Sequence, residues 1–384
     1  MKKIFYLGFY DTADNKAEKR NICLAATNKM TYIVSALEKA GYEVELFSAS
    51  HTKDKKNGYK GKSVKLGNHS TLVLFRTLPW GNKLQKLLSV INSEFQLYRY
   101  ILKNIGKNDT LIVYHSVAYA KAVCFLKKLK KFKLILETEE IYSDVVETEK
   151  SREIETEIFN VADAFILSTE LLNDKINKNN KPNCTIYGTY TVEENRNCRF
   201  NDDKIHVVYA GTFHPLKGGA ATSISAAEFL DNRYHLHIIG FGNDEDTETV
   251  KKQIEDISKK SDCKLTYDGM LTGEDYIRFL QSCHIGLSTQ NPDAQYNDTS
   301  FPSKILSYMA NGLNVVTVKI KVLEQSAIDS MLYYYEKSNG EEIAKAIKNI
   351  DLSKKNDSRE IIADLDKKFV SDIRTLLEVA NEKE

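Results

Sequence analysis

Short apolar runs alternate with longer amphipathic stretches along the whole chain. Six runs in the first half have the length and composition of strands, at residues 3–10, 43–48, 71–75, 110–114, 133–137 and 164–168. Residues 21–40 instead carry apolar side chains at helical spacing and stop at Gly41. Strands separated by helices indicate a parallel sheet that is covered on both faces.

The rhythm breaks at residues 188–204, a polar segment with few large aliphatic side chains, which we expect to link two domains. A second array follows, with expected strands near 205–210, 235–239, 264–267, 284–288 and 313–318. Residues 356–380 form one long amphipathic helical pattern. The pattern predicts an α/β protein with two parallel-sheet domains. Ligands of such sheets bind at the carboxyl ends of the strands, which places the function at the domain interface.

The composition of the chain argues against several classes of protein. The 54 basic and 53 acidic residues give a net charge of +1, whereas a nucleic-acid-binding protein is usually strongly basic. The six cysteines are scattered without a C-x-x-C pair, which favours a reducing cytoplasm over disulfides or a structural zinc site. We expect no signal peptide and no spanning helix, because no apolar stretch reaches about 18 residues. A cytoplasmic protein, soluble or peripheral to a membrane, is therefore expected.

Three strand–loop–helix junctions in the second half suit an anion. In H-V-V-Y-A-G-T-F-H-P-L-K-G-G (206–219) a strand runs into Gly211, and a helix is expected to begin near Lys217. The sequence I-I-G-F-G-N-D (238–244) again opens a strand into glycines. In S-F-P-S-K-I-L-S-Y-M-A-N-G (300–312), Ser300 is expected to cap a helix and Pro302 to lie in its first turn, with Ser303 and Lys304 where backbone amides point outward. Glycine lets backbone amides approach a phosphate, and lysine adds charge. None of the junctions is a Walker A or Rossmann fingerprint.

Together with Y-D-G-M-L-T-G-E-D-Y (267–276), these elements resemble the nucleotide-binding domain of GT-B glycosyltransferases, particularly the family-4-like (group 1) enzymes of polysaccharide biosynthesis. The resemblance covers about residues 205–318. The first half resembles the acceptor domain more loosely, in architecture and in Y-H-S (114–116) after a strand. It implies two Rossmann-like domains facing each other across a cleft. Their expected bounds are 1–190 for acceptor binding, 205–355 for the nucleotide-sugar, and 356–384 for a helix packing back towards the first domain.

The resemblance also implies roles for individual residues. Gly211, Thr212 and Lys217 would hold the donor pyrophosphate, with Gly240 and Gly242 beside it and with Ser303 and Lys304 completing the site. Met270 and Leu271 would meet the nucleobase through backbone atoms. His115 would face the transferred sugar. The chain departs from the family at Thr212, where arginine is common, and at Ser307, where a glutamate binds the ribose. Thr299 and Ser307 occupy the spacing of the usual glutamate pair, which leaves the nucleotide open.

The expected chemistry needs no metal and no cofactor. Fixed amide dipoles and lysines stabilise the charge that develops on a departing diphosphate. Asp244-x-Asp246 matches a metal-binding D-x-D formally, but its place after the glycine turn favours a helix cap. His235 and His237 alternate with apolar residues, which favours a packed or edge position over a metal site. Retention of the anomeric configuration is an expectation from the family alone.

The acceptor side is less specific. Glu137, Glu139 and Glu140 follow a strand, and one of them, assigned as Glu140, would act as acceptor base or orient a hydroxyl, although a solvated loop explains them equally well. Lysines interleaved with apolar residues at 125–133 suit an anionic bilayer or a solvated helix face; they include Lys127, Lys128, Lys130 and Lys131. W-G-N-K-L-Q-K-L-L (80–88) has a similar character.

The sequence therefore predicts a glycosyltransferase that moves a sugar from a nucleotide donor, by default a UDP-sugar, to a saccharide acceptor. A lipid-linked acceptor at the inner face of the plasma membrane, as in capsule synthesis, fits best. Two alternatives stay open: a UDP-sugar epimerase of the same fold, and an inactive partner that binds glycan or nucleotide. Nucleoside diphosphate release that depends on an acceptor separates the transferase from both.

Overall fold

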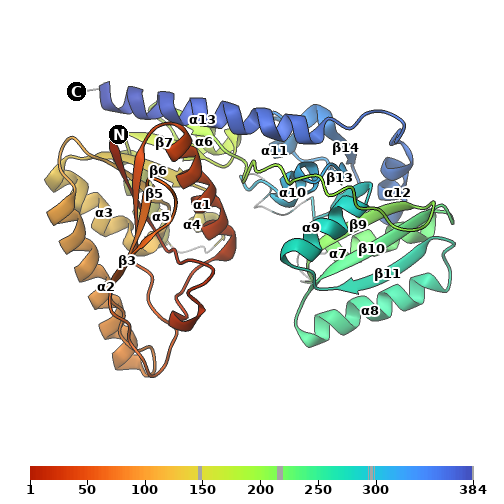
Figure 1. Ribbon diagram of the computed structural model, residues 1–384, viewed down its shortest axis with the longest axis horizontal. Helices are drawn as coiled ribbons and strands as arrows, with labels where there is room; N and C mark the ends of the chain where they lie inside the picture. The colour runs from red at the N-terminus through yellow and green to blue at the C-terminus, as the bar shows by residue number, and fades with distance from the viewer. Residues whose placement is uncertain (146–148, 214–218, 293, 295–296, 298, 383–384) are drawn as a thin grey trace. The chain divides into compact units, whose positions relative to one another are not determined.

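The computed structural model describes residues 1–145, 149–213, 219–292, 294, 297 and 299–382. The chain divides into two compact units, and Figure 1 shows the helices and strands of each. The first unit comprises residues 1–189 and 367–384, and the second comprises residues 190–366. The segment expected to be a linker thus lies largely within the second unit. Its Phe200 ring stacks on His206 there, at 4.0 Å between centroids.

The first unit is built on a single eight-stranded sheet. In spatial order its strands are β3 (Lys62–Lys65), β4 (Ser70–Leu74), β2 (Glu43–Ser48), β1 (Lys3–Gly8), β5 (Thr110–Tyr114), β6 (Lys133–Thr138), β7 (Ala164–Leu167) and β8 (Asn183–Thr185). Its helices are α1 (Leu24–Lys39), α2 (Lys83–Asn104), α3 (Val117–Lys130), α4 (Tyr142–Val145), α5 (Glu149–Val161), α6 (Glu170–Ile176) and the end of α13 (Ser358–Glu382). All pairings are parallel except β3 with β4.

Burial explains the apolar runs of the central strands. Leu111, Ile112 and Val113 of β5 are all fully buried, because helices cover both faces of a parallel sheet. Leu97 and Ile101 of α2 join the core on one face. The ring of Tyr32 on α1 stacks on Phe369 of α13 at 5.9 Å.

The second unit has a six-stranded, all-parallel sheet. Its spatial order is β11 (Lys264–Gly269), β10 (Tyr234–Phe241), β9 (Ile205–Thr212), β12 (Ile285–Ser288), β13 (Asn314–Val318) and β14 (Leu332–Tyr335). The helices are α7 (Gly219–Ser225), α8 (Asp244–Ser258), α9 (Gly273–Ser282), α10 (Lys304–Ala310), α11 (Lys321–Glu324) and α12 (Gly340–Lys348). This is the strand order of a Rossmann sheet, and the direction of winding reverses between β9 and β12.

The predicted strands are confirmed to within a few residues, but three further strands carry no such signal in the sequence. β3 reads K-S-V-K, is largely exposed, and pairs antiparallel at the sheet edge. β8 has only three residues, and β14 reads L-Y-Y-Y. Among the described residues, no helix combines the length and the apolar character that crossing a bilayer requires.

Candidate functional site

The strand ends of the second unit meet where the winding reverses. Gly211 at the end of β9 pairs with Gly240 at the end of β10. Gly240 has φ +141°, and a Cβ placed on it would lie 1.8 Å from the carbonyl oxygen of Gly211. Glycine is therefore required at this position for the two strand ends to approach. Both glycines are half-buried at the carboxyl end of the sheet, where ligands of such sheets bind.

A cation lies beside this strand end. The Nζ of Lys304, at the first position of α10, is 4.3 Å from the ring centroid of Tyr209. It also lies 3.0 Å from the point where a Cβ on Gly211 would stand, so a side chain at residue 211 would crowd the ammonium group. Burial raises the pKa of Tyr209 to about 12, which keeps its hydroxyl protonated at neutral pH. Lys304 and Gly211 thus come together as the sequence analysis expected.

A buried tyrosine fixes α10 against the sheet. The Tyr308 hydroxyl accepts a hydrogen bond from the amide of Ala210 at 2.9 Å and donates to the carbonyl of Leu287 at 3.3 Å. Gly286 of β12 leaves the room for its ring, since a Cβ there would lie 2.4 Å from Tyr308 Cγ. These contacts set the position of Lys304, one turn earlier. Neither residue was predicted to belong to the site, and the sequence signal for them was the glycine inside a short apolar strand.

The start of α7 is held by the end of β12. Thr289 donates from its hydroxyl to the carbonyl of Gly219 at 2.7 Å, and its Oγ1 lies 2.7 Å from the Ser223 hydroxyl. Thr212 is exposed at the end of β9. Lys217, expected to be the main phosphate ligand, lies outside the described residues, so its place stays a prediction.

The second glycine turn leads into an acidic helix. Asn243 caps α8 by accepting a hydrogen bond from the amide of Asp246 at 2.7 Å. Asp244, Glu245 and Asp246 fill the first turn. The expectation that the D-x-D residues cap the helix is corrected: Asn243 is the cap, and the two aspartates interact with the helix dipole instead. Their charge repels phosphate, which favours a diphosphate near Lys304 over one near Gly242.

The remaining donor-side candidates lie near the same edge. Met270 and Leu271 follow β11, and the Met270 side chain is 57% exposed. Ser307 lies on α10, where its Oγ is 3.5 Å from the Tyr276 hydroxyl. Ser303 precedes α10 without a capping hydrogen bond from its side chain. The helix begins at Lys304, later than Ser300 and Pro302 suggest.

In the first unit, His115 follows β5 but is only 2% exposed. Its Nε2 lies 2.7 Å from Oε1 of Glu155. The same carboxylate accepts hydrogen bonds from two backbone amides, that of Tyr142 at Oε1 and that of Ser143 at Oε2. Burial opposes ionisation of Glu155, but the hydrogen bond from His115 and those from Ser143 lower its pKa. His115 is thus held in a hydrogen-bond network inside the unit.

The three glutamates after β6 have different surroundings. Glu137 is fully buried, accepts a hydrogen bond from the Tyr6 hydroxyl, and has a second oxygen without a partner. Glu139 is paired with Lys29, and its side chain is 28% exposed. Glu140 is half-buried. The sequence pointed to Glu140, whereas the fully buried carboxylate is Glu137 and the carboxylate held by a lysine is Glu139.

Glu137 gives the first unit a pH-dependent stability. Burial and the neighbouring Glu139 raise the pKa of Glu137 to about 8, against the opposing effects of Lys29 and the Tyr6 hydroxyl. The unfolded chain releases this proton near pH 4.3, so stability present below that pH is lost as pH rises towards 8. We expect the loss, at most about 1.4 kcal/mol per pH unit, to disappear in Glu137→Gln. Thermal denaturation at pH 5, 6.5 and 8 measures it, and identical pH profiles would contradict it.

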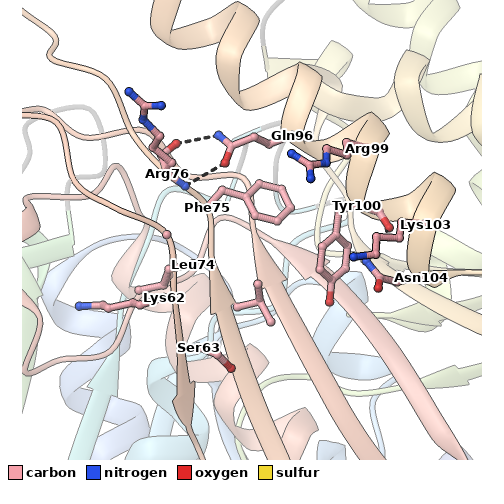
Figure 2. Close-up of a pocket in the computed structure, with 12 residues that line it drawn as sticks. Lys62, Ser63, Leu74, Phe75, Arg76, Gln96, Arg99, Tyr100, Lys103 and Asn104 are labelled. Atoms are coloured by element: carbon pink, nitrogen blue, oxygen red, sulfur yellow. Dashed lines mark hydrogen bonds between the residues drawn. The ribbon is translucent and has the colours of Figure 1, made fainter.

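An open pocket of about 500 Å³ lies between β4 and the second half of α2. Its lining contains the cationic side chains of Lys62, Arg76, Arg99 and Lys103, and, among the described residues, no carboxylate. Figure 2 shows Gln96 hydrogen-bonded to the backbone of Arg76. The Arg76 amide donates to Gln96 Oε1 at 3.0 Å, and Gln96 Nε2 donates to the Arg76 carbonyl at 2.7 Å. Lys62 is paired with Glu18 at 2.7 Å. The pocket suits an anionic group.

Comparison with known proteins identifies the GT-B fold. Residues 204–350 match the model of a family described as glycosyl transferases group 1. The trehalose-6-phosphate synthase OtsA is 11% identical over 100% of this chain and 99% of its own, with a TM-score of 0.68. Sucrose-phosphate synthase from Thermosynechococcus elongatus is 12% identical over 98% of each chain, with a TM-score of 0.65. The Anabaena protein Alr3699/HepE, in complex with UDP and glucose, is 13% identical over 100% of each, at 0.62. No curated protein matches the sequence.

Proposed function

We propose that this chain, which has the GT-B fold and whose residues 204–350 match the group 1 glycosyl transferases, transfers a sugar from a UDP-sugar to a hydroxyl of a lipid-linked saccharide. The proposal rests mainly on the position of Gly211, which lies close to both Gly240 and Lys304 on the strand where the second sheet reverses its winding. UDP is the proposed nucleotide because HepE is described with UDP and glucose, and a trehalose-6-phosphate protein from E. coli is described with UDP-2-fluoro glucose.

The donor-side groups act on the leaving diphosphate. As the bond from the sugar C1 to the phosphate oxygen breaks, negative charge grows on the UDP oxygens. The Lys304 ammonium and the amides near Gly211 stabilise that charge without a divalent ion, and Lys217 is proposed to add a second ammonium. Met270 and Leu271 are proposed to border the uracil. We propose retention of the anomeric configuration, as the family resemblance implies.

On the acceptor side, Glu139 replaces Glu140 as our proposed base. Its carboxylate is partly exposed and held by Lys29, which also donates to the carbonyl of Ile186 at 2.8 Å. It is therefore able to take the proton of an acceptor hydroxyl as the new bond to the sugar C1 forms. Glu137, buried behind it, is a positioning residue. We keep His115 as a candidate near the sugar, with its ring oriented by Glu155.

A lipid-linked acceptor is supported by an unusual second apolar face on α2. Leu97 and Ile101 are buried in the core, whereas six apolar side chains on the opposite side are between 43% and 64% exposed. This exposed stripe comprises Leu84, Leu87, Leu88, Ile91, Phe95 and Leu102. Phe125 and Leu129 of α3 add to the exposed apolar area. Such a stripe beside the cationic pocket suits the surface of an anionic membrane.

Three of the four lysines first assigned to membrane contact have other partners, and the fourth, Lys131, is exposed. Lys127 is paired with Asp163, and Lys128 with Glu157 at 2.7 Å. Lys130 donates to the carbonyl of Leu102 at 3.0 Å, and Lys131 ends α3 in the left-handed conformation. We therefore propose that the stripe, more than these lysines, makes the contact.

Vesicle binding tests the stripe. We expect the triple variant Leu87→Ser, Ile91→Ser, Phe95→Ser to lower partitioning onto phosphatidylglycerol-rich vesicles by more than about tenfold, since each apolar side chain contributes roughly 1–2 kcal/mol when buried. Phe229→Ser, at an exposed phenylalanine of the second unit, is the matched control and should bind as the unmodified protein does. Equal sedimentation of the triple variant and the control would remove the stripe from the interface.

Calorimetric titration with UDP, GDP, TDP and CDP, with and without magnesium, tests the donor site. Tight binding of UDP that does not need magnesium supports the proposal, and selective binding of another diphosphate would change the donor. Release of UDP only when an acceptor is present then separates the transferase from the epimerase. Binding without turnover would favour the inactive partner.

A further inference from the structure

Three buried histidines converge on one face of the second sheet, far from the donor edge. Register places His206 of β9 directly beside His235 of β10, and His237 lies on the same face two residues later. The three are 2%, 5% and 1% exposed. One ring nitrogen from each lies within 4.8 Å of the others. We call these three residues the histidine triad.

Two carboxylates contact two of the rings, those of His206 and His237. Nε2 of His206 lies 2.7 Å from Asp202, and Nδ1 of His237 lies 3.0 Å from Asp268. Where each carboxylate accepts a ring N–H, the opposite nitrogens, Nδ1 of His206 and Nε2 of His237, face each other at 2.9 Å, a distance that requires a proton or a cation between the two lone pairs. A histidine that ligates a metal almost always gives its other N–H to such a carboxylate.

The third ring has an unsatisfied nitrogen. Nε2 of His235 is 3.0 Å from the Thr266 hydroxyl, whereas its Nδ1 is buried without any hydrogen-bond partner. An unpaired buried polar atom costs about 1–3 kcal/mol. A metal ion bound among the three rings would give this nitrogen a partner and so offset that cost.

The charges fit a divalent cation. Asp202 lies against the ring of His206 and Asp268 against the ring of His237, so two carboxylates are placed beside the histidine triad. Two carboxylates therefore balance a charge of +2.

We propose that His206, His235 and His237 bind a zinc ion, with Asp202 and Asp268 orienting the rings. Three imidazoles supply three of the four ligands that zinc takes, with solvent as the fourth. His206 lies five residues before Gly211 on the same strand, about 16 Å from the donor edge at 3.3 Å per residue. At that distance the ion would take no part in the proposed sugar transfer. It would fasten the segment before β9, whose Phe200 ring stacks on His206 and on His237 at 4.9 Å.

Zinc binding to the full chain, freed of metal by chelation, tests the site. We expect one zinc ion per chain, a higher melting temperature with zinc than with magnesium, and the visible bands of tetrahedral cobalt after Co²⁺ substitution. Asp268→Asn keeps all three ligands and should weaken binding about 10–100-fold. His206→Gln and His235→Gln should weaken it further. His69→Gln, at an exposed histidine of the first unit, is the matched control and should leave it unchanged.

Two results would overturn the site. One is zinc binding by the unmodified protein that is no tighter than binding by His235→Gln. The other is a stoichiometry that falls in His69→Gln but not in the triad variants. Either would leave the triad as a hydrogen-bonded network alone. Because the readouts are metal binding and stability, they do not depend on sugar transfer.

Discussion

Replacing Lys304 by alanine is expected to lower kcat/KM for sugar transfer by about 10²–10³-fold, the usual effect of removing one group that stabilises charge in the transition state. Its Nζ lies against Tyr209 and next to the open strand end at Gly211, where the diphosphate is proposed to bind. The loss should appear both in UDP affinity and in turnover. Calorimetric titration with UDP and the rate of acceptor-dependent UDP release measure the two separately.

The control for this change is Lys345→Ala, because Lys345 is exposed on α12 of the same unit. It removes the same charge from the unit and should leave both readouts unchanged. Lys304→Arg keeps the charge and should recover part of the affinity, although a guanidinium has a different shape. Unchanged UDP affinity in Lys304→Ala would remove this residue from the phosphate site.

Gly240→Ala should be the most damaging single substitution at the donor edge. The added Cβ would lie 1.8 Å from the Gly211 carbonyl oxygen, at a φ of +141° that residues with a Cβ rarely adopt. The ends of β9 and β10 must then separate, which we expect to cost about 3–5 kcal/mol. The melting temperature should fall by about 10 °C, and UDP binding should be lost.

The variant Gly273→Ala tests the effect of backbone strain without the steric clash expected in Gly240→Ala. Gly273 also has a positive φ, at +57°, but a Cβ there meets nothing within 4 Å. We expect it to cost only about 1–2 kcal/mol, measured by the same thermal denaturation. If the two variants melted together, the close approach of Gly211 and Gly240 would not be a constraint on the fold.

The sequence alone determined the elements and the class of the fold. Periodicity reports which side of a segment is buried, so the parallel strands and the long C-terminal helix were predicted correctly. Gly211 and Gly240 could be identified from the sequence because a glycine at a strand end reflects a local requirement of the backbone. Short or polar edge strands such as β3 left no such trace, since an exposed edge buries little.

Only the tertiary structure decided which distant residues meet. Glu137, Glu139 and Glu140 look alike in sequence, yet burial against Tyr6 sets Glu137 apart. His235 and His237 are visible as a pair, but the alignment of β9 with β10 brings His206 beside them. Pairings of this kind depend on strand order, which forms from contacts far apart along the chain and which local periodicity does not record.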